Sequence, residues 1–191
     1  MNSPAYLFAD DTKIYREIKE TADIDILQQD LSKLEEWSNT WLLKFHPDKC
    51  KHMTISRDKN PKETSYKLMG QNIGKTEEEK DIGVIVDSKL KFEKHISEKV
   101  NKANSIFAVI RRSFRHLNAE TFLPMYKSMV RSQLDYASSI WAPYQKKLVD
   151  KIEQVQKRAT KQIPGLGNLS YPDRLKKLKL PTLSYRRIRG T

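Results

Sequence analysis

The sequence of 191 residues predicts an α+β fold with a mixed first part and an all-helical second part. Three observations support this prediction. Short β-branched and apolar runs bounded by turn residues lie before residue 92, one long stripe of helix-spaced apolar residues lies among them, and from Phe92 onward the apolar period is helical. The composition also shifts near residue 91, so we expect two domains, residues 1–92 and 93–191.

Two short apolar runs near the start of the chain flank the tetrapeptide Phe8-Ala9-Asp10-Asp11. This pattern predicts a β-hairpin with two acidic residues at its tip. Two adjacent carboxylates can bind Mg²⁺ through their oxygens and so position a nucleotide triphosphate. They can also form an ordinary turn, because Asp hydrogen-bonds its own backbone. These residues alone leave both interpretations open.

An amphipathic helix is predicted from Thr21 to about Lys44. Residues 21–23 offer capping groups, and the helix should end before His46 and Pro47, because proline disfavours a helical conformation in the residue before it. We expect its apolar stripe to pack against a sheet. The stripe consists of Ile24, Leu27, Leu31, Leu34, Trp37 and Trp41.

Short strands should follow this helix and form a partial antiparallel sheet with it packed on one face. We predict strands at residues 51–56 and 66–69, a turn at residues 70–72, and a short strand at Ile73. Residues 77–80 are highly charged and predict a solvated loop. The β-branched run at residues 81–86 predicts a further strand.

The second half predicts a basic helical bundle. A first helix buries Ile96, Val100, Ala103, Ile106, Phe107 and Ile110; a second, capped by Asn118, buries Phe122, Leu123, Tyr126, Met129 and Val130; a third, from about residue 145, buries Leu148, Ile152, Val155 and Ala159. A short basic helix near residues 171–178 and an Arg-rich end follow. At helical spacing, aromatic residues are usually core, so we assign Trp37, Trp41, Tyr126, Tyr136 and Trp141 to the core rather than to base stacking.

The net charge of +12 lies almost entirely in the second half. Residues 1–90 carry 14 Lys or Arg and 17 Asp or Glu, whereas residues 91–191 carry 22 and 7. Such an imbalance predicts a polyanionic partner such as nucleic acid, because few of these Lys and Arg side chains can form ion pairs within the chain. The alternative is a set of ordinary solvated Lys-rich helix faces.

Composition also predicts a soluble, intracellular protein with no membrane partner, in the nucleus or the cytoplasm. No apolar run approaches the roughly 18 residues of a membrane span, and the single cysteine, Cys50, excludes an internal disulfide. His46, Cys50 and His52 are zinc-ligand types, but they lack a fourth ligand and the usual paired spacing, so we do not predict zinc there.

Four blocks in order resemble the reverse transcriptases of non-LTR retrotransposons of the jockey or CR1 type, and they cover nearly the whole chain. The blocks are Phe8-Ala9-Asp10-Asp11-Thr12-Lys13; the helix from Leu27 through Trp37 and Trp41 to Pro47, Lys49 and Cys50; residues 81–87 followed by Leu90, Phe92, His95 and Ile96; and the helical remainder with Leu134-Asp135-Tyr136-Ala137 and Trp141. The resemblance implies part of a polymerase palm in residues 1–92 and a thumb in residues 93–191.

The same resemblance implies two-metal nucleotidyl transfer by an RNA-directed DNA polymerase. It makes Asp10 and Asp11 catalytic metal ligands for Mg²⁺ or Mn²⁺, places Lys49 near the incoming deoxynucleotide triphosphate, and makes Gly83 and Val84 a primer grip. The partners it implies are an RNA template and a DNA primer, or their hybrid duplex. From the residue alone, Lys49 could equally be a loop lysine that points to water.

This family takes a further catalytic aspartate and the fingers from segments before the aspartate box, and we expect the chain to lack both. Mg²⁺ demands near-octahedral oxygen ligands, so we expect weak metal binding and no activity from the chain alone. The alternative function is a non-catalytic module that binds nucleic acid with its basic half. The expected phosphate contacts are Arg111, Arg112, Arg115, Lys157, Arg158, Lys161, Arg174, Lys176 and Lys177.

Overall fold

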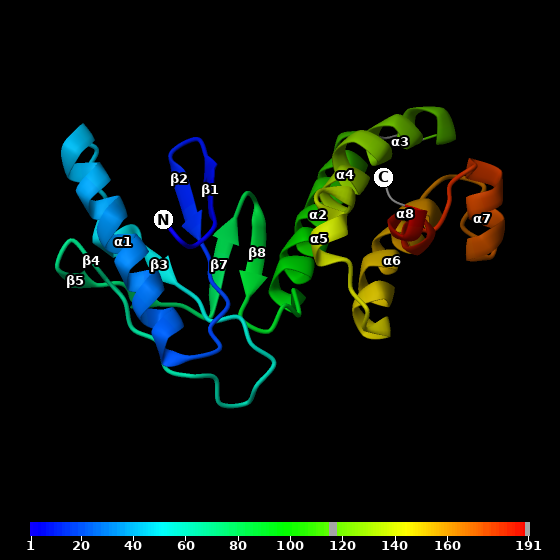
Figure 1. Cartoon of the computed structure of the whole chain (residues 1–191). Helices are drawn as coiled ribbons and strands as arrows, with labels where there is room; N and C mark the ends of the chain where they lie inside the picture. Colours follow the sequence, from blue (N-terminus) through cyan, green and yellow to red (C-terminus); the bar gives the residue numbers. More distant parts are fainter. Residues whose placement is uncertain (115–117, 190–191) are drawn as a thin grey trace. The chain divides into compact units, whose positions relative to one another are not determined.

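A computed structural model describes residues 1–114 and 118–189, which form two compact units, Met1–Glu79 and Lys80–Thr191 (Figure 1). The first unit mixes short strands with one long helix, and the second is mostly helical. The predicted α+β class is therefore confirmed. Among the described residues, no helix is both long and apolar enough to cross a membrane.

Among the described residues, the first unit contains three short strand pairs rather than one sheet, and a fourth pair, Glu78–Asp81 with Val84–Asp87, begins at its end. Strand β1 pairs with β2 and β4 with β5, both antiparallel, while β3 and β6 pair in parallel. The elements of this unit are β1 (Ala5–Phe8), β2 (Asp11–Ile14), α1 (Thr21–Trp41), η1 (Pro47–Lys49), β3 (Lys51–His52), β4 (Lys67–Leu68), β5 (Gln71–Asn72) and β6 (Gly74–Lys75).

Helix α1 begins where the sequence predicts, and Asp23, one of the residues expected to cap it, does so together with Glu20. Glu20 and Asp23 form a capping box, in which each side chain accepts from the backbone of the other residue. Backbone N–H groups of Glu20 and Lys19, which donate to Asp23, lower the pKa of that carboxyl. The helix ends at Trp41 rather than near Lys44, because Leu42 adopts a left-handed conformation with φ 57°.

The apolar stripe of α1 is only partly buried. Ile24, Leu27 and Leu31 pack against a small core of Tyr66, Leu68 and Ile73. The two tryptophans farther along the helix lie outside this cluster, with Trp37 exposed at 46% and Trp41 at 65%. Their assignment to the core was wrong, because strand β4 and the buried residues around it cover only the earlier turns of the helix.

A buried carboxylate in α1, Asp30, holds the N-terminal residues. It is 0% exposed and accepts the backbone N–H groups of Asn2, at 2.9 and 3.0 Å, and of Ser3, at 2.7 Å. Burial raises the pKa of this carboxyl, but the two backbone donors together with Lys33, whose ammonium lies at 3.5 Å, outweigh it and lower the pKa to about 2. The charged form of Asp30 therefore stabilises the folded unit.

We expect Asp30→Asn to destabilise the first unit by about 2 kcal/mol at neutral pH. Because the folded pKa lies below the unfolded one, this stabilisation is present above about pH 4 and is lost as the pH falls toward 2. Urea unfolding at several pH values should thus show a shallower acid dependence in the variant. Asp25→Asn, on an exposed position of the same helix, is the control, and equal behaviour of the two variants would contradict the assignment.

The second unit groups a β-hairpin with the helices. The two units divide between Glu79 and Lys80, whereas the boundary predicted from the sequence follows residue 92. The hairpin belongs with the helices because its Val84 is 3% exposed and packs in the helical core. The elements that follow β6 are β7 (Glu78–Asp81), β8 (Val84–Asp87), α2 (Glu93–Ser113), α3 (Ala119–Met125), η2 (Tyr126–Arg131), α4 (Ser132–Asp135), α5 (Ser138–Trp141), α6 (Lys146–Lys161), α7 (Tyr171–Leu178) and α8 (Leu183–Arg189).

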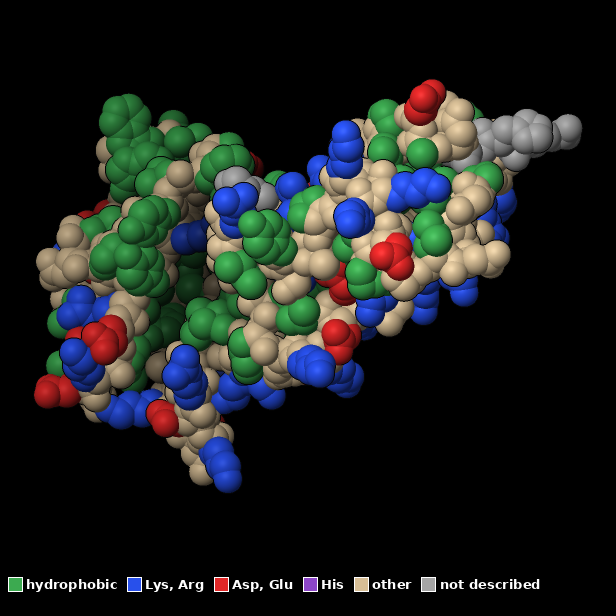
Figure 2. All heavy atoms as spheres, turned by 90° about the vertical axis from the view of Figure 1, so that its right-hand side faces the viewer, with side chains coloured by type: hydrophobic (Ala, Val, Ile, Leu, Met, Phe, Trp, Pro, Cys, Tyr) green, Lys and Arg blue, Asp and Glu red, His purple; other side chains and the backbone are tan. Residues whose placement is uncertain are grey.

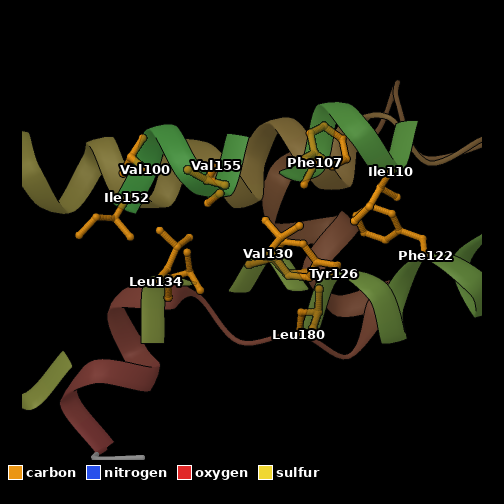
Figure 3. Close-up of a cluster of buried hydrophobic side chains, with 14 of the residues drawn as sticks. Val100, Phe107, Ile110, Phe122, Tyr126, Val130, Leu134, Ile152, Val155 and Leu180 are labelled. Atoms are coloured by element: carbon orange, nitrogen blue, oxygen red, sulfur yellow. The ribbon is translucent and has the colours of Figure 1, made fainter. Parts of the chain in front are cut away.

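The helical core contains most of the side chains that the sequence places there (Figure 3). Asn118 caps α3 as predicted, accepting the Thr121 N–H at 2.9 Å. Met129 is 48% exposed, contrary to the prediction. It lies in η2, a π-helical segment that follows Pro124, and the wider turn moves this residue off the apolar face.

The buried carboxylate of Glu153 in α6 accepts hydrogen bonds from the backbone at the start of α8. Its two oxygens accept the N–H groups of Leu183 and Ser184, each at 3.2 Å, and its Oε1 also accepts the hydroxyl of Tyr171. Gln156, one turn along α6, accepts the Tyr126 hydroxyl at 2.8 Å and donates to Tyr171 at 2.9 Å. This network joins α6, α7 and α8. The sequence analysis predicted α7 but not α8.

Candidate functional site

The two predicted metal ligands lie at the tip of the β1–β2 hairpin. Phe8 pairs with Asp11, which leaves Ala9 and Asp10 as a two-residue connection, and Ala9 has φ 54°. Positive φ is uncommon for a residue other than glycine. The predicted hairpin with acids at its tip is confirmed, and the tight turn holds the two aspartates next to each other.

The aspartate pair is open to solvent. Asp10 and Asp11 are exposed, and within the described residues their side chains form no hydrogen bond or ion pair. No group of three His, Cys, Asp or Glu side chains in the described part of the chain is close enough to hold a metal ion. The described residues thus supply two carboxylate ligands at this tip, fewer than the six oxygens that Mg²⁺ prefers.

Lys49 lies at the end of η1, in the same unit, and its side chain is exposed. Within the described residues it makes no ion pair, and so none with Asp10 or Asp11. The structure leaves its predicted role untested. Its backbone is fixed by the 3₁₀ turn, in which the Lys49 N–H donates to the His46 carbonyl at 3.0 Å.

Residues 81–86, predicted as one strand, are strand at Asp81 and at Val84–Val86, but a turn at Ile82 and Gly83 divides them between two strands of a second hairpin. Ile82 has φ 43° and Gly83 has φ 78°, the positive pair that characterises a two-residue type I′ turn between β7 and β8. The charged residues 78–80, predicted as loop, form most of β7. Gly83 and Val84, the predicted primer grip, therefore lie at the turn and at the first residue of β8.

Tyr136 holds this turn in place. Its hydroxyl donates to the Ile82 carbonyl at 2.8 Å, and its ring lies beside Gly83, where an added Cβ would be 3.4 Å from the ring. Its own carbonyl accepts the Trp141 indole N–H at 2.8 Å. Tyr136 is 48% exposed, so its assignment to the core was wrong, while Tyr126 at 0% and Trp141 at 1% confirm the prediction for those two.

A buried histidine supports the same hairpin from α2. His95 is 1% exposed, and its Nδ1 accepts the Ile85 N–H at 3.1 Å. Burial, together with the nearby Lys99 ammonium, lowers the pKa of His95 to about 4. The ring is therefore neutral at physiological pH, which its role as a hydrogen-bond acceptor requires.

A groove of about 540 Å³ lies beside the turn, and it was not predicted from the sequence. Gly83 forms part of its lining, and Glu98 is the one carboxylate among the lining residues. The other lining residues are Lys80, Lys99, Asn101, Lys102, Ser105 and Gln133. The signal in the sequence is the polar stripe Glu98, Asn101, Lys102 and Ser105, whose spacing places them on one face of α2.

Most of the predicted phosphate contacts are accessible. Figure 2 shows one face of the molecule, on which Lys and Arg side chains are widely spread and Asp and Glu side chains are few. Lys157 is half-buried, with its ammonium 5.5 Å from the centre of the Tyr171 ring. Arg115 lies outside the described residues. The exposed members of the predicted set are Arg111, Arg112, Arg158, Lys161, Lys176 and Lys177.

Arg174 differs from the rest of that set. It is 6% exposed, and its guanidinium donates to the carbonyls of Leu169, at 3.2 Å, and Lys157, at 3.4 Å. The group also lies 5.6 Å from the centre of the Tyr171 ring. A phosphate cannot reach a side chain buried in this way, so we remove Arg174 from the expected contacts and assign it to packing between α6 and α7.

Comparisons with known proteins relate the chain to reverse transcriptases of mobile elements. It is 27% identical over 151 residues to the RNA-directed DNA polymerase from mobile element jockey of Drosophila funebris, and 24% identical over 164 residues to that of Drosophila melanogaster. These matches cover 74% and 83% of this chain but only 16% and 18% of the two polymerases. The chain therefore resembles a portion of a retrotransposon polymerase.

A third relative is an uncharacterized protein of Caenorhabditis elegans, 31% identical over 111 residues. That match covers 56% of this chain and 56% of the worm protein, so the chain spans about half the length of this relative. No protein-family model matches the chain, and no solved structure matches it.

Proposed function

We propose that this chain is the palm and thumb part of a retrotransposon RNA-directed DNA polymerase, with the palm in its first part and the basic helices as the thumb. The observation that carries the proposal is the similarity to the two jockey polymerases over most of the chain. The aspartate pair at the tip of a tight hairpin is the local geometry expected for carboxylates that hold divalent metal ions.

In this proposal, Asp10 and Asp11 would hold Mg²⁺ or Mn²⁺ through their carboxylate oxygens. Bound there, the ions would activate a primer hydroxyl and neutralise charge on the leaving pyrophosphate. The two-residue turn places both aspartates at the tip of the hairpin, and their exposure leaves them open to a deoxynucleotide triphosphate and to further ligands. Lys49 would neutralise charge on the departing pyrophosphate or donate a proton to it.

The β7–β8 turn would contact the primer strand through its backbone. Val84 is buried, so its side chain is not available, whereas Gly83 has no side chain to shield the turn. Tyr136 and His95 would act as positioning residues, because they hold the carbonyl of Ile82 and the N–H of Ile85. The RNA template and DNA primer, or their hybrid duplex, would then follow the basic helices.

We expect the chain alone to be inactive as a polymerase. Two carboxylates provide too few ligands for a pair of metal ions, and no third acidic, histidine or cysteine ligand lies near them in the described residues. The test is incubation with a primed RNA template, the four deoxynucleotide triphosphates, and Mg²⁺ or Mn²⁺. Primer extension that Asp10→Ala abolishes would contradict the expected inactivity.

Metal binding provides a second readout of the same site. Mn²⁺ should broaden the NMR signals of Ala9 and Thr12 first, and Asp10→Ala together with Asp11→Ala should remove that effect, because the paramagnetic ion acts only on nearby nuclei. Asp25→Ala on α1 serves as the matched control. Broadening that is unchanged by loss of both tip aspartates would contradict their assignment as metal ligands.

A second candidate function is nucleic-acid binding without catalysis. The charge imbalance supports it, because residues 91–191 carry 22 Lys or Arg against 7 Asp or Glu. The accessible Lys and Arg side chains of α2, α6 and α7 would contact phosphates without reading the nucleotide sequence. This function needs no metal and is compatible with an inactive polymerase part.

A further inference from the structure

We propose that His95 is a pH-sensitive latch, whose neutral ring holds the β7–β8 hairpin against α2 and whose protonation releases the hairpin. This role is independent of the proposed polymerase function, although the hairpin carries Gly83 and Val84, the predicted primer grip. Two features of the ring point to it. One ring nitrogen binds the hairpin, and the other is buried with no hydrogen-bond partner among the described residues.

The hydrogen bond between His95 and the hairpin requires the neutral ring. Nδ1 accepts the Ile85 N–H of β8 at 3.1 Å, so the single proton of the neutral ring lies on Nε2. Protonation adds a second N–H at Nδ1, and two donors then face each other at this distance. The hydrogen bond that joins α2 to β8 at Ile85 is therefore lost when the ring becomes charged.

The surroundings of the ring do not accommodate a charge. His95 is 1% exposed, and its ring lies against that of Trp141, which is also 1% exposed, with the two ring centres 5.2 Å apart. Within the described part of the chain, no acceptor is present for Nε2. Burying a charged group without a partner is unfavourable. The imidazolium is stabilised only when water reaches it, which requires β8 to separate from α2.

The charged groups around the ring also oppose its protonation. On its own helix, the Lys99 ammonium disfavours the imidazolium and the Glu98 carboxylate favours it. Strand β8 contributes Asp87, whose carboxylate accepts backbone N–H groups of the turn that follows, and α5 contains no titratable side chain. Burial, with the smaller effect of Lys99, lowers the pKa of His95 from its ordinary 6.5 to about 4.

The hairpin, rather than the helix, is the element that can move. Val84 is the one buried residue in β7 and β8, whereas α2 buries six residues, His95 among them. At the turn, the Tyr136 hydroxyl that donates to the Ile82 carbonyl belongs to a side chain that is 48% exposed. Segments with few buried contacts open locally at a lower free energy than the core. Loss of the His95 hydrogen bond should therefore open the hairpin before it unfolds the helices.

The opening of the hairpin should depend on pH in the range where free histidine titrates. In the open state the ring has its ordinary pKa of 6.5, so the open state binds a proton more readily than the closed state. The equilibrium constant for opening should therefore rise about 30-fold as the pH falls from about 7.5 to about 5. Free Asp and Glu side chains titrate near pH 4, so this window favours the histidine.

The test is hydrogen–deuterium exchange of the whole chain, followed by NMR across this pH window. The protection factor of the Ile85 amide, corrected for the intrinsic exchange rate, should fall about 30-fold. His95→Asn offers an uncharged side-chain oxygen as acceptor and should abolish this fall. Lys99→Gln, which removes the opposing charge, should make the fall smaller. His46→Asn, at an exposed histidine, is the control and should retain the full effect.

Two further measurements separate release of the hairpin from general unfolding. Ile85 should exchange faster than Val155, a core residue of α6, at every pH. In the unmodified chain, the His95 ring signals should shift over the same pH range in which the protection of Ile85 is lost. This second measurement needs no variant, so it decides the matter even if His95→Asn does not fold.

Four outcomes would overturn the proposal. A protection factor of Ile85 that is independent of pH in the unmodified chain shows that the ring does not control the hairpin. An equal fall in His95→Asn assigns the effect to another group. Equal exchange of Ile85 and Val155 shows that the hairpin opens only when the unit unfolds. Protonation of the His95 ring while Ile85 stays protected shows that the charged ring does not release β8.

Discussion

Replacing Glu153 by alanine should destabilise the helical unit by about 3–5 kcal/mol. The carboxylate is 7% exposed and accepts three hydrogen bonds, from the N–H groups of Leu183 and Ser184 and from the Tyr171 hydroxyl. Alanine would leave all three donors without this acceptor, the Leu183 N–H buried and the other two partly buried, and a buried donor left unsatisfied costs about 1–3 kcal/mol. The loss is a large fraction of the 5–15 kcal/mol that typically stabilises a folded domain.

The effect should be local before it is global. Helix α8 begins at Leu183, so hydrogen–deuterium exchange should rise first in residues 183–189, and urea unfolding should give a lower midpoint. Asp150→Ala, on an exposed position of the same helix α6, removes an equal charge and should change stability by less than about 0.5 kcal/mol. Equal midpoints and equal exchange in the two variants would show that Glu153 does not hold α8.

The helices could be predicted where the apolar period and the caps agree. The helix near residues 171–178 matches α7, and Asn118 caps α3 as expected, because side-chain spacing and capping act within a few residues of sequence. Helix α8 was missed because it is short, with seven residues, and Arg-rich. Its position also depends on Glu153, thirty residues earlier in the chain.

The β7–β8 hairpin could not be read from local pattern. A run of β-branched residues predicts a continuous strand, but the chain turns at Ile82, whose φ of 43° is rare for such a residue. Contacts from Tyr136, which lies 54 residues away, hold that turn. Such tertiary contacts override local propensity, and sequence spacing does not reveal them.

The candidate site also contains a part that local sequence predicts and a part that depends on tertiary packing. The aspartate pair was predicted because a hairpin tip is a local feature, and the structure places both residues there. The groove combines Lys80 and Gly83 with residues of α2 and with Gln133, so it exists only after the hairpin and the helices pack. Arg174 shows the converse, since a basic residue in a basic segment proved to be buried.

The affinity of the chain for a primer–template duplex should fall steeply with salt. If about five of the accessible Lys and Arg side chains contact phosphates, a plot of log K against log salt should have a slope of about −4.5. Raising the salt from about 50 to 200 mM should then weaken binding about 500-fold. The seven candidates for these contacts are Arg111, Arg112, Lys157, Arg158, Lys161, Lys176 and Lys177. Base sequence should have little effect, because phosphate contacts carry no sequence information.

Two exposed basic residues of α6, Arg158 and Lys161, allow a sharper test of this prediction. Arg158→Ala/Lys161→Ala removes two expected contacts and should make the slope shallower by about 1.8. Lys127→Ala/Lys146→Ala changes the net charge equally at positions outside the expected set and should leave the slope unchanged. The comparison separates phosphate contact from general charge attraction.

The central claim is that the basic helical unit binds the nucleic-acid backbone as part of a polymerase-related chain, and a salt titration of primer–template binding tests it most directly. Fluorescence anisotropy with a labelled RNA–DNA hybrid, measured from about 50 to 200 mM salt, should give the steep slope described above. The slope should be reduced in Arg158→Ala/Lys161→Ala and unchanged in Lys127→Ala/Lys146→Ala. Undetectable binding at the lowest salt concentration, or an affinity that does not change across the range, would contradict the claim.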